Sequence, residues 1–249
     1  MQEVLTEKLR LLQFEFTAYP GNATVPELDD NGVHVWFAPA PGHSLQPAQF
    51  KPVLSSDELA RVARFRFDSD RENFVFARGM LRILLGTYLE IAGQGVRFSY
   101  SEKGKPYLAS QPGAGLQFNL SHSSGAVQLA ICRNRSIGAD IERVREDLEV
   151  EEIAARFFSQ KERQTLMSLP AEQRHDAFFR CWTRKEALLK AKASGLSFSL
   201  DLFDVSMTAG EKNVALSTRP DPQEAARWRI YPVTVRAGYA AAVAVGLNE

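Results

Sequence analysis

The sequence predicts a globular fold that contains both helices and strands, on three observations. Three segments carry a Ser-x-x-Glu pattern, which is typical of helix N-termini. Several others alternate apolar and polar residues, as half-buried strands do. The chain has 249 residues, of which 45% are hydrophobic and 24% charged, the proportions of an ordinary globular protein. That length allows one large domain or two lobes.

The overall charge argues against broad electrostatic binding. Lys+Arg and Asp+Glu are both 30, so there is no basic field for nucleic acid or an acidic membrane. An anionic ligand would need a local cluster. The start of the chain lacks the pattern of a signal peptide, and no apolar run approaches the ~20 residues of a membrane span. With only Cys132 and Cys181, both in apolar surroundings, we expect a cytoplasmic protein without disulfides.

The first third of the chain predicts one strand and two helices. We interpret residues 1–31 as an extension with a short helix over Leu5–Leu12. Val33–Ala38 is the first expected strand. Helices are expected to start at the Ser55/Glu58 and Ser69/Glu72 pairs, and the second to continue to about Ala92, where Gly93 would stop it.

Arginines gather on and before the second helix. Arg61 and two further arginines precede it, and Arg71, Arg78 and Arg82 share one of its faces. Acids are interleaved with them, so this could be a solvated face. A docking site for phosphate is the alternative, and the segment alone leaves both open.

The middle of the chain predicts strands with polar ends. Val96–Tyr100 and Leu116–Leu120 alternate, and the turn Gly104-Lys105-Pro106 between them projects a lysine. The second strand runs into Ser121-His122-Ser123-Ser124-Gly125, which suits phosphate oxygens, although a turn histidine is commoner. Ala126–Cys132 is nearly all apolar and is expected to be a central strand.

Two acids stand within the next apolar strand, Ile137–Glu142. Asp140 and Glu142 are two residues apart and therefore point to the same face. Neighbouring carboxylates raise each other's pKa unless a cation lies between them. They could lie at a solvated strand edge with basic partners. They could also bind a hard cation such as Mg²⁺, which prefers oxygen ligands.

A long helix is expected over Glu172–Ala193, after shorter helices at Leu148–Arg156 and from Ser159. Trp182, Glu186 and Lys190 are spaced by four and share one face. The acid and base could be a surface pair or half of an active site. The remaining strands are expected at Asp201–Thr208, Val214–Ser217, Trp228–Val235 and Tyr239–Val245.

Five of these segments, in this order and spacing, resemble the 4′-phosphopantetheinyl transferases, in the long two-lobed, surfactin-synthetase-activating form. The resemblance covers about Val33 to Leu202. The segments are Gly104-Lys105-Pro106, Phe118–Ser123, Ile137–Glu142, Phe157-Phe158-Ser159 and Trp182–Lys190.

The resemblance implies an α+β fold of two similar lobes related by a pseudo-twofold axis. Each lobe would be a small, mostly antiparallel sheet packed with a long helix, and the active site would lie in the cleft between lobes. The expected divisions are an extension at residues 1–31 and lobes at 32–134 and 135–249. A monomer is expected, because one chain would supply both halves of the cleft.

The resemblance also implies the reaction. The family moves 4′-phosphopantetheine from coenzyme A to a serine of an apo acyl or peptidyl carrier protein and releases adenosine 3′,5′-bisphosphate. The carrier could belong to a fatty acid, polyketide or nonribosomal peptide synthase. By position, the Mg²⁺ or Mn²⁺ ligands would be Asp140, Glu142 and Glu186. The groups that hold coenzyme A phosphates would be Arg61, Arg78, Lys105, Ser121 and His122.

Our mechanistic hypothesis makes Glu186 the base that takes the serine proton, directly or through a metal-bound water, and Lys190 the group that stabilises or protonates the departing bisphosphate. Trp182 would fix the helix in the core, and Arg143–Phe158 would contact an acidic carrier. Two other classes fit the same residues. One is a coenzyme A or nucleotide binding protein without transfer activity, and the other is a Mg²⁺-dependent phosphodiesterase.

Overall fold

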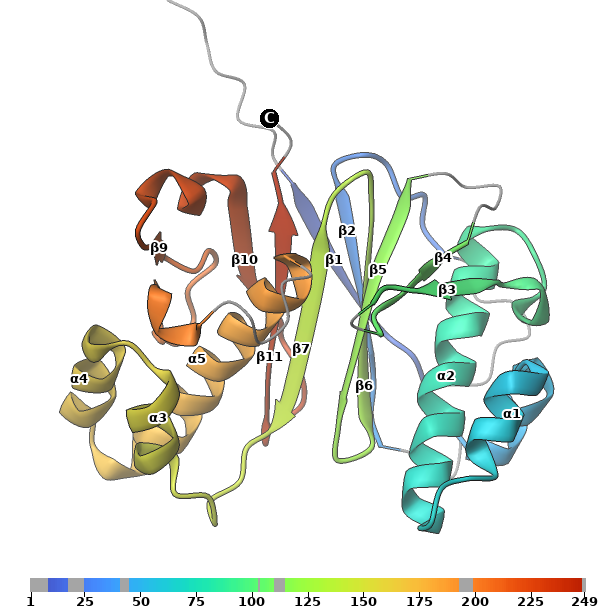
Figure 1. Cartoon of the computed structure of the whole chain (residues 1–249), viewed down its shortest axis with the longest axis horizontal. Coiled ribbons are helices and arrows are strands. Elements are labelled where there is room, and N and C mark those ends of the chain that lie inside the picture. Colours follow the sequence, from blue (N-terminus) through green and yellow to red (C-terminus); the bar gives the residue numbers. More distant parts are fainter. Residues whose placement is uncertain are drawn as a thin grey trace, which may run out of the picture. The chain divides into compact units, whose positions relative to one another are not determined.

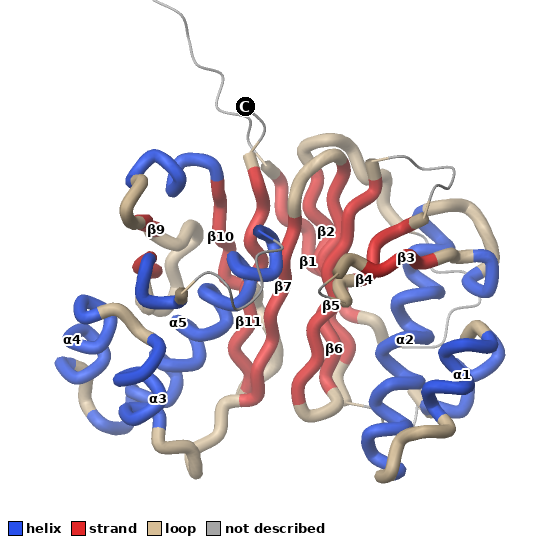
Figure 2. Tube along the Cα trace, in the orientation of Figure 1, coloured by secondary structure: helices blue, strands red, loops and turns tan. Residues whose placement is uncertain are grey.

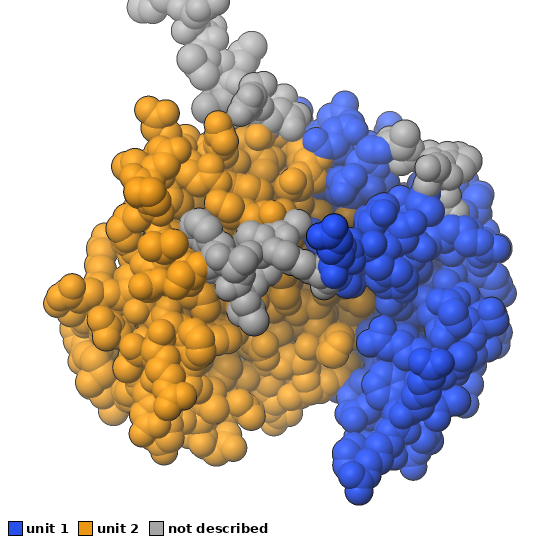
Figure 3. All heavy atoms as spheres, in the orientation of Figure 1, with its two compact units in different colours: residues 1–117, 131–134 blue, residues 118–130, 135–249 orange. Residues whose placement is uncertain are grey.

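The computed structural model describes residues 9–17, 25–40, 45–102, 104–109, 115–192 and 199–247. The chain divides into two compact units, coloured in Figure 3: unit 1 is Met1–Gln117 with Ile131–Asn134, and unit 2 is Phe118–Ala130 with Arg135–Glu249. Each unit contains strands and one long helix (Figures 1 and 2), which confirms the α+β class. The structure assigns residues 118–130 to the second unit, whereas we expected a single border after residue 134. The cleft between the lobes stays a prediction.

Unit 1 begins with a strand where we expected a helix. β1 (Arg10–Glu15) pairs in parallel with β2 (Gly32–Ala38), and Phe14 stacks on Trp36 with ring centroids 4.7 Å apart. The helix over Leu5–Leu12 is therefore wrong for residues 10–12, while residues 1–8 lie outside the described residues. The pairing partner, which local periodicity does not reveal, decides the conformation here.

Two helices follow the 3-10 turn η1 (Pro47–Val53). α1 (Ser56–Val62) starts at Ser55 as expected, since the Ser55 amide donates to Glu58 Oε2 at 3.0 Å. α2 (Asp68–Tyr88) does not use the Ser69 cap. Its N-cap is Phe67, whose carbonyl accepts from the Arg71 amide at 3.2 Å.

The end of α2 also differs from the expectation. Glu90 adopts a left-handed φ of 56°, and the Ile91 amide donates to the Gly86 carbonyl at 2.9 Å. This is a Schellman ending with glutamate at the left-handed position, so the helix ends four residues before the predicted Ala92. Beyond it lie η2 (Gly93–Gly95) and the small antiparallel pair β3 (Phe98–Tyr100) and β4 (Pro106–Leu108).

The strands of the first sheet have the order β1-β2-β6-β5. β5 (Leu116–Ser123) and β6 (Ala126–Arg133) each have residues in both units, and β6 is buried along nearly its whole length, as predicted. The left-handed Ser124 and Gly125, with φ of 48° and 82°, make the tight turn between them.

Unit 2 is built on a three-stranded antiparallel sheet of order β10-β11-β7: β10 (Trp228–Pro232), β11 (Tyr239–Gly246) and β7 (Ile137–Arg143). The long helix α5 (Ala171–Lys192) packs against β7 and β11 (Figure 1). Its bounds agree with the predicted Glu172–Ala193 to within one residue. The core of the unit lies between this helix and the sheet.

Smaller elements complete unit 2: α3 (Val150–Phe157), α4 (Gln160–Ser168), η4 (Leu200–Leu202), the antiparallel pair β8 (Phe203–Val205) and β9 (Leu216–Thr218), and η5 (Pro222–Arg227). The predicted Ser159/Glu162 capping box is present at α4, with the Glu162 amide 3.2 Å from Ser159 Oγ. None of the described helices has a stretch long and apolar enough to cross a bilayer.

Candidate active site

The two acids of β7 are each held by a serine of β5. Ser121 Oγ donates to Asp140 Oδ1 at 3.0 Å, and Ser123 Oγ donates to Glu142 Oε2 at 2.7 Å. Both strands have a side-chain period of two, so the alternate hydroxyls match the alternate acids. The acids therefore do face the same side, as predicted, and neither is a loose side chain at a strand edge.

Lys190 of α5 pairs with the first of these acids. Its Nζ lies 2.6 Å from Asp140 Oδ1 and 3.2 Å from Ser121 Oγ. Lys190 therefore forms an ion pair between helix and strand, which supports the second of the two alternatives, a lysine that is part of a site. Asp140 is 2% exposed, so the lysine compensates a buried carboxylate.

Burial controls the acidity of this group. Loss of water is the largest cause that raises the pKa of Asp140; Lys190 opposes it, the Glu142 charge adds to it, and the net pKa is about 6. The pKa of Glu186 is also raised, first by burial and then by the Asp140 charge. Three carboxylates and one lysine thus act on one another electrostatically, and perturbed acids of this kind are typical of functional sites.

In its second half, helix α5 leaves mainly one face accessible. Trp182, Glu186 and Lys190 are partly exposed, whereas the intervening residues from Thr183 to Leu189 are buried. Trp182 stacks on Phe178 with ring centroids 5.7 Å apart, consistent with the anchoring role we expected. The predicted shared face is confirmed, and it is the face that carries the acid and the base.

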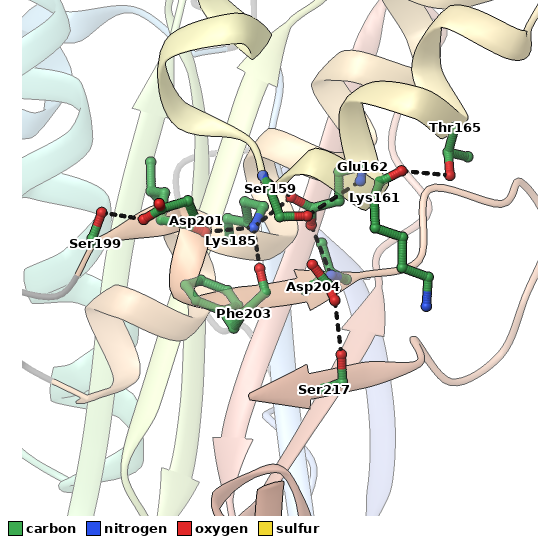
Figure 4. A network of polar contacts seen from close by, with 12 residues as sticks. Ser159, Lys161, Glu162, Thr165, Lys185, Ser199, Asp201, Phe203, Asp204 and Ser217 are labelled. Carbon is green, nitrogen blue, oxygen red and sulfur yellow. Dashed lines mark hydrogen bonds and ion pairs between the residues drawn. The ribbon is translucent and has the colours of Figure 1, made fainter. Parts of the chain in front are cut away.

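A buried lysine next to Glu186 fixes this helix to the chain that follows it (Figure 4). Lys185 is 0% exposed, and its Nζ donates to the carbonyls of Leu200 at 2.7 Å and Phe203 at 2.6 Å. It also lies 2.8 Å from Glu162 Oε2. All three ammonium protons therefore have partners, and the charge is compensated by the same glutamate that caps α4.

The donors of the site suit a hard cation. Asp140 Oδ2 is buried and has no hydrogen-bond partner within the described part of the chain, so a carboxylate oxygen is left for a ligand. Carboxylate oxygens are the donors that Mg²⁺ prefers. Over the described residues, however, no three His, Cys, Asp or Glu side chains are grouped closely enough to form a ready metal site. The ligand set Asp140, Glu142 and Glu186 stays a prediction, centred on Asp140.

The predicted phosphate ligands are distributed over both units. Ser121 and His122 lie in unit 2 on β5 and Lys105 in unit 1, in the turn after left-handed Gly104 with φ of 78°. His122 is exposed, and partial loss of water followed by the Lys190 charge lowers its pKa. Ser121 is buried at the end of the Asp140 carboxylate rather than at a free surface.

Two arginines of α2, Arg78 and Arg82, are buried rather than part of a solvated face, whereas Arg61 is exposed. Arg82 is 3% exposed and its Nε lies 2.6 Å from Glu58 Oε2, while Arg78 Nε lies 3.3 Å from Glu58 Oε1. Arg78 and Arg61 line a cavity of about 500 Å³. Buried Arg78 Nη1 has no hydrogen-bond partner among the described residues. The cavity can therefore offer cationic donors to an anion.

A second cavity, of about 400 Å³, opens beside Glu142 in unit 2. Its apolar part includes Trp182 and Phe178, and its polar part includes Arg143 and Arg145. Phe157 is 42% exposed and Phe158 is 3% exposed, so one of the two adjacent phenylalanines belongs to the core and the other to the surface.

Comparison with known proteins gives the family. A model described as the 4′-phosphopantetheinyl transferase superfamily matches residues 136–244, and one described as 4′-phosphopantetheinyl transferase, N-terminal, matches residues 44–134. The 4′-phosphopantetheinyl transferase HetI of Nostoc is 40% identical over 84% of this chain and 87% of its own length. This chain belongs to the 4′-phosphopantetheinyl transferase family.

Other members of the family are also similar over most of their length. A putative 4′-phosphopantetheinyl transferase of Synechocystis is 32% identical over 79% of this chain and 77% of its own length. The 4′-phosphopantetheinyl transferase Sfp of Bacillus subtilis is 31% identical over 64% of this chain and 69% of its own length. The resemblance seen in the sequence motifs is thereby confirmed for this transferase.

Sequence reasoning missed several residues that shape the transferase site. The pattern Asn-x-Ser-x-Ser in β5 has the same period of two as the acids of β7. This match could have predicted that Asn119 and Ser123 form hydrogen bonds with β7. Gly138 and Lys185 stand inside motifs that we had used only for recognition. Their roles depend on which backbone lies opposite, which a single sequence does not show.

Proposed function

We propose that this chain transfers the 4′-phosphopantetheine group of coenzyme A to a serine hydroxyl of an apo acyl or peptidyl carrier protein. Adenosine 3′,5′-bisphosphate is the second product. We also propose that it acts in the cytoplasm as a monomer, because the acids and the lysine all come from one chain.

One observation carries the proposal beyond family membership. Lys190 Nζ lies 2.6 Å from Asp140 Oδ1, and Glu186 stands one helical turn before that lysine on the same face. A base, a cation and a buried acid are therefore assembled where a phosphoryl group could be transferred. A protein that only bound coenzyme A would need hydrogen-bond donors for the phosphates. It would not need a base with a raised pKa beside those donors.

Glu186 is the proposed general base. Burial and the Asp140 charge raise its pKa, which makes it a stronger proton acceptor than an exposed glutamate. It takes the serine proton as the serine oxygen bonds to the phosphorus of the phosphopantetheine. The bond from that phosphorus to the bridging oxygen of the pyrophosphate breaks.

Lys190 is the proposed partner of the leaving group. The bridging oxygen departs with the bonding electron pair, so negative charge grows on the bisphosphate. The ammonium group of Lys190 can stabilise that charge or donate a proton to it. Asp140 holds the ammonium through the 2.6 Å contact and so fixes its place during the reaction.

Asp140, Glu142 and Glu186 are the groups proposed to hold Mg²⁺, or Mn²⁺ in its place. When bound, the ion would neutralise the charge of the pyrophosphate. Lys105, His122, Arg61 and Arg78 are proposed contacts for the coenzyme A phosphates, while Ser121 bears on the site through its hydrogen bond to Asp140. Among these, Arg61 and Arg78 line one cavity in unit 1, together with Arg64 and the acids Asp57 and Glu58.

The segment Arg143–Phe158 is the proposed contact for the carrier. Arg143 and Arg145 are exposed, and they border a cavity with an apolar wall beside Glu142. An acidic carrier helix would match the arginines, and exposed Phe157 could add an apolar contact at the rim.

The test is the intact mass of an apo carrier protein after incubation with this chain, coenzyme A and Mg²⁺. A gain of one phosphopantetheine that EDTA prevents would support both the reaction and the metal. A gain that EDTA does not affect would overturn the metal assignment alone. No gain on acyl and peptidyl carriers, with coenzyme A binding measurable, would overturn the transfer activity and favour a binding protein.

A further inference from the structure

The edge of β7 that does not pair with β11 is bonded to side chains of β5. The amide of Ala139 donates to Asn119 Oδ1 at 2.9 Å. The amides of Ile141 and Arg143 donate to the hydroxyls of Ser121 at 3.4 Å and Ser123 at 3.1 Å. Alternate amides of a strand face the same edge. Side chains of every second residue in β5 therefore bond the amides of every second residue in β7.

The hydroxyls do more than accept these amides. A serine hydroxyl has one proton to donate and two lone pairs. Ser123 gives its proton to Glu142 and accepts from Arg143. Ser121 gives its proton to Asp140, and its two lone pairs receive the Ile141 amide and Lys190 Nζ. Each hydroxyl thus connects the backbone of β7 to the acid one residue earlier.

We propose that Ser121 and Ser123 are positioning residues that orient the carboxylates of Asp140 and Glu142 for a divalent cation. A hydrogen bond to one oxygen of a carboxylate fixes the rotation of the group and the direction of its other oxygen. For Asp140 that other oxygen is the buried, unpartnered Oδ2. The inference rests on the proposed metal site and assigns its second layer of contacts.

This assignment changes the role expected for Ser121. Its proton is directed to Asp140, so the hydroxyl has no further hydrogen to offer a phosphate oxygen in this arrangement. Ser121 acts through the acid, whereas its neighbour on β5, His122, is exposed and can contact phosphate directly.

Asn119 provides the matched control. It makes the same kind of bond to the β7 backbone, but it has no contact with an acid among the interactions of the described residues. Replacing it removes one rung of the contact between β5 and β7 and leaves both carboxylates with their serines. Any effect that comes only from loosening the strands should therefore be present in N119A.

The experiment measures Mn²⁺ affinity by electron paramagnetic resonance, in the presence of saturating coenzyme A, for the full chain and for S121A, S123A, S123T and N119A. Thermal unfolding of each variant is recorded in parallel. We expect S121A and S123A to bind Mn²⁺ about ten-fold more weakly or worse. S123T keeps the hydroxyl and should bind within about two-fold of the unmodified chain, as should N119A, whose melting temperature should nevertheless fall.

Three outcomes would overturn the inference. The first is an unchanged Mn²⁺ affinity in both S121A and S123A. The second is an equal loss of Mn²⁺ affinity in N119A and S123A. Either result would mean that the hydroxyls only hold the strands together and do not orient the carboxylates. If the unmodified chain bound no Mn²⁺, the metal site itself would fall, and the inference with it. That last result is distinguished from failure of the transfer reaction by the mass measurement on the carrier.

Discussion

A Cβ built on Gly138 would lie 2.0 Å from the carbonyl oxygen of Ala187. It would also lie 2.3 Å from the amide nitrogen of Ala191. The strand β7 and the helix α5 therefore touch through their backbones, which only glycine permits at this position. The contact sets how far Asp140, two residues along the strand, stands from the face that carries Glu186 and Lys190.

The first prediction concerns that contact. Replacing Gly138 with alanine should force the strand and helix apart. This should lower the unfolding free energy by ~1–3 kcal/mol. Carrier labelling should fall even at temperatures where the variant is folded, because the ion pair between Asp140 and Lys190 depends on the spacing. Chemical denaturation and the labelling rate would be measured for G138A. G246A is the control, since its added Cβ would meet its nearest neighbour at 3.5 Å, an ordinary contact.

The sequence was sufficient to predict the bounds of elements that their own residues determine. The bounds of α5 follow from its period and length, and the start of α4 follows from the Ser159/Glu162 box. It was insufficient where the partner decides. β1 is a strand because β2 pairs with it, and α2 ends early because Glu90 takes the left-handed conformation without being glycine.

The candidate site shows the same division. The period of two placed Asp140 and Glu142 on one face, and the step of four placed Glu186 and Lys190 on another. Which of these groups pair depends on how helix and strand cross, so the Lys190–Asp140 ion pair could not be read from spacing. The buried arginines of α2 were also ambiguous, because their acid, Glu58, comes from a different helix.

The second prediction concerns the buried Lys185. Replacing it with methionine should lower the unfolding free energy by ~3–5 kcal/mol, because the Glu162 carboxylate and two carbonyls lose their buried partner. Urea denaturation would measure this. K161M, on the exposed surface of α4, should change the unfolding free energy by less than ~0.5 kcal/mol. The double variant E162Q/K185M should regain part of the loss, and a cost in K185M no larger than in K161M would contradict the assignment.

The third prediction concerns pH and the buried His34. Its Nδ1 lies 2.7 Å from the Tyr88 hydroxyl, and burial lowers its pKa from 6.5, with the Asp29 charge opposing this effect. Below pH 6.5 the unfolded chain binds a proton that the native chain does not, so stability rises with pH in this window and is lost as pH falls toward the folded pKa.

The slope for one such group is at most about 1.4 kcal/mol per pH unit. Chemical denaturation would give the unfolding free energy of the unmodified chain and of H34N at several pH values between 5 and 7. The two plots of unfolding free energy against pH should converge toward the acid side. The comparison is of slopes and not of absolute stability, since H34N also loses packing. Parallel curves for the two proteins would show that His34 is not the group responsible.

The fourth prediction concerns the proposed base. E186Q should lower the rate of carrier labelling about 10²–10⁴-fold, because the amide cannot accept the serine proton. The side chain is nearly isosteric, so the melting temperature should change little. E172Q, exposed in the first turn of the same helix, should label the carrier at the original rate. A near-normal rate in E186Q would remove Glu186 from the chemical step.

The last prediction concerns the carrier surface. Arg143 and Arg145 are exposed at the mouth of the cavity beside Glu142. Charge reversal in R143E/R145E should raise the carrier KM about ten-fold or more, with the coenzyme A KM unchanged, because like charges on the variant and an acidic carrier slow their association. Added salt should raise the carrier KM of the unmodified enzyme and affect the variant much less.

The control for charge reversal is K161E/R163E, which makes the same change in net charge on exposed residues of α4. If a general attraction between enzyme and carrier were responsible, both double variants would show the same rise in carrier KM and the same loss of salt dependence. A rise confined to R143E/R145E would locate the contact at the end of β7, because that is where these two arginines meet the apolar wall formed by Phe178 and Trp182. An unchanged carrier KM in R143E/R145E would place the docking surface elsewhere.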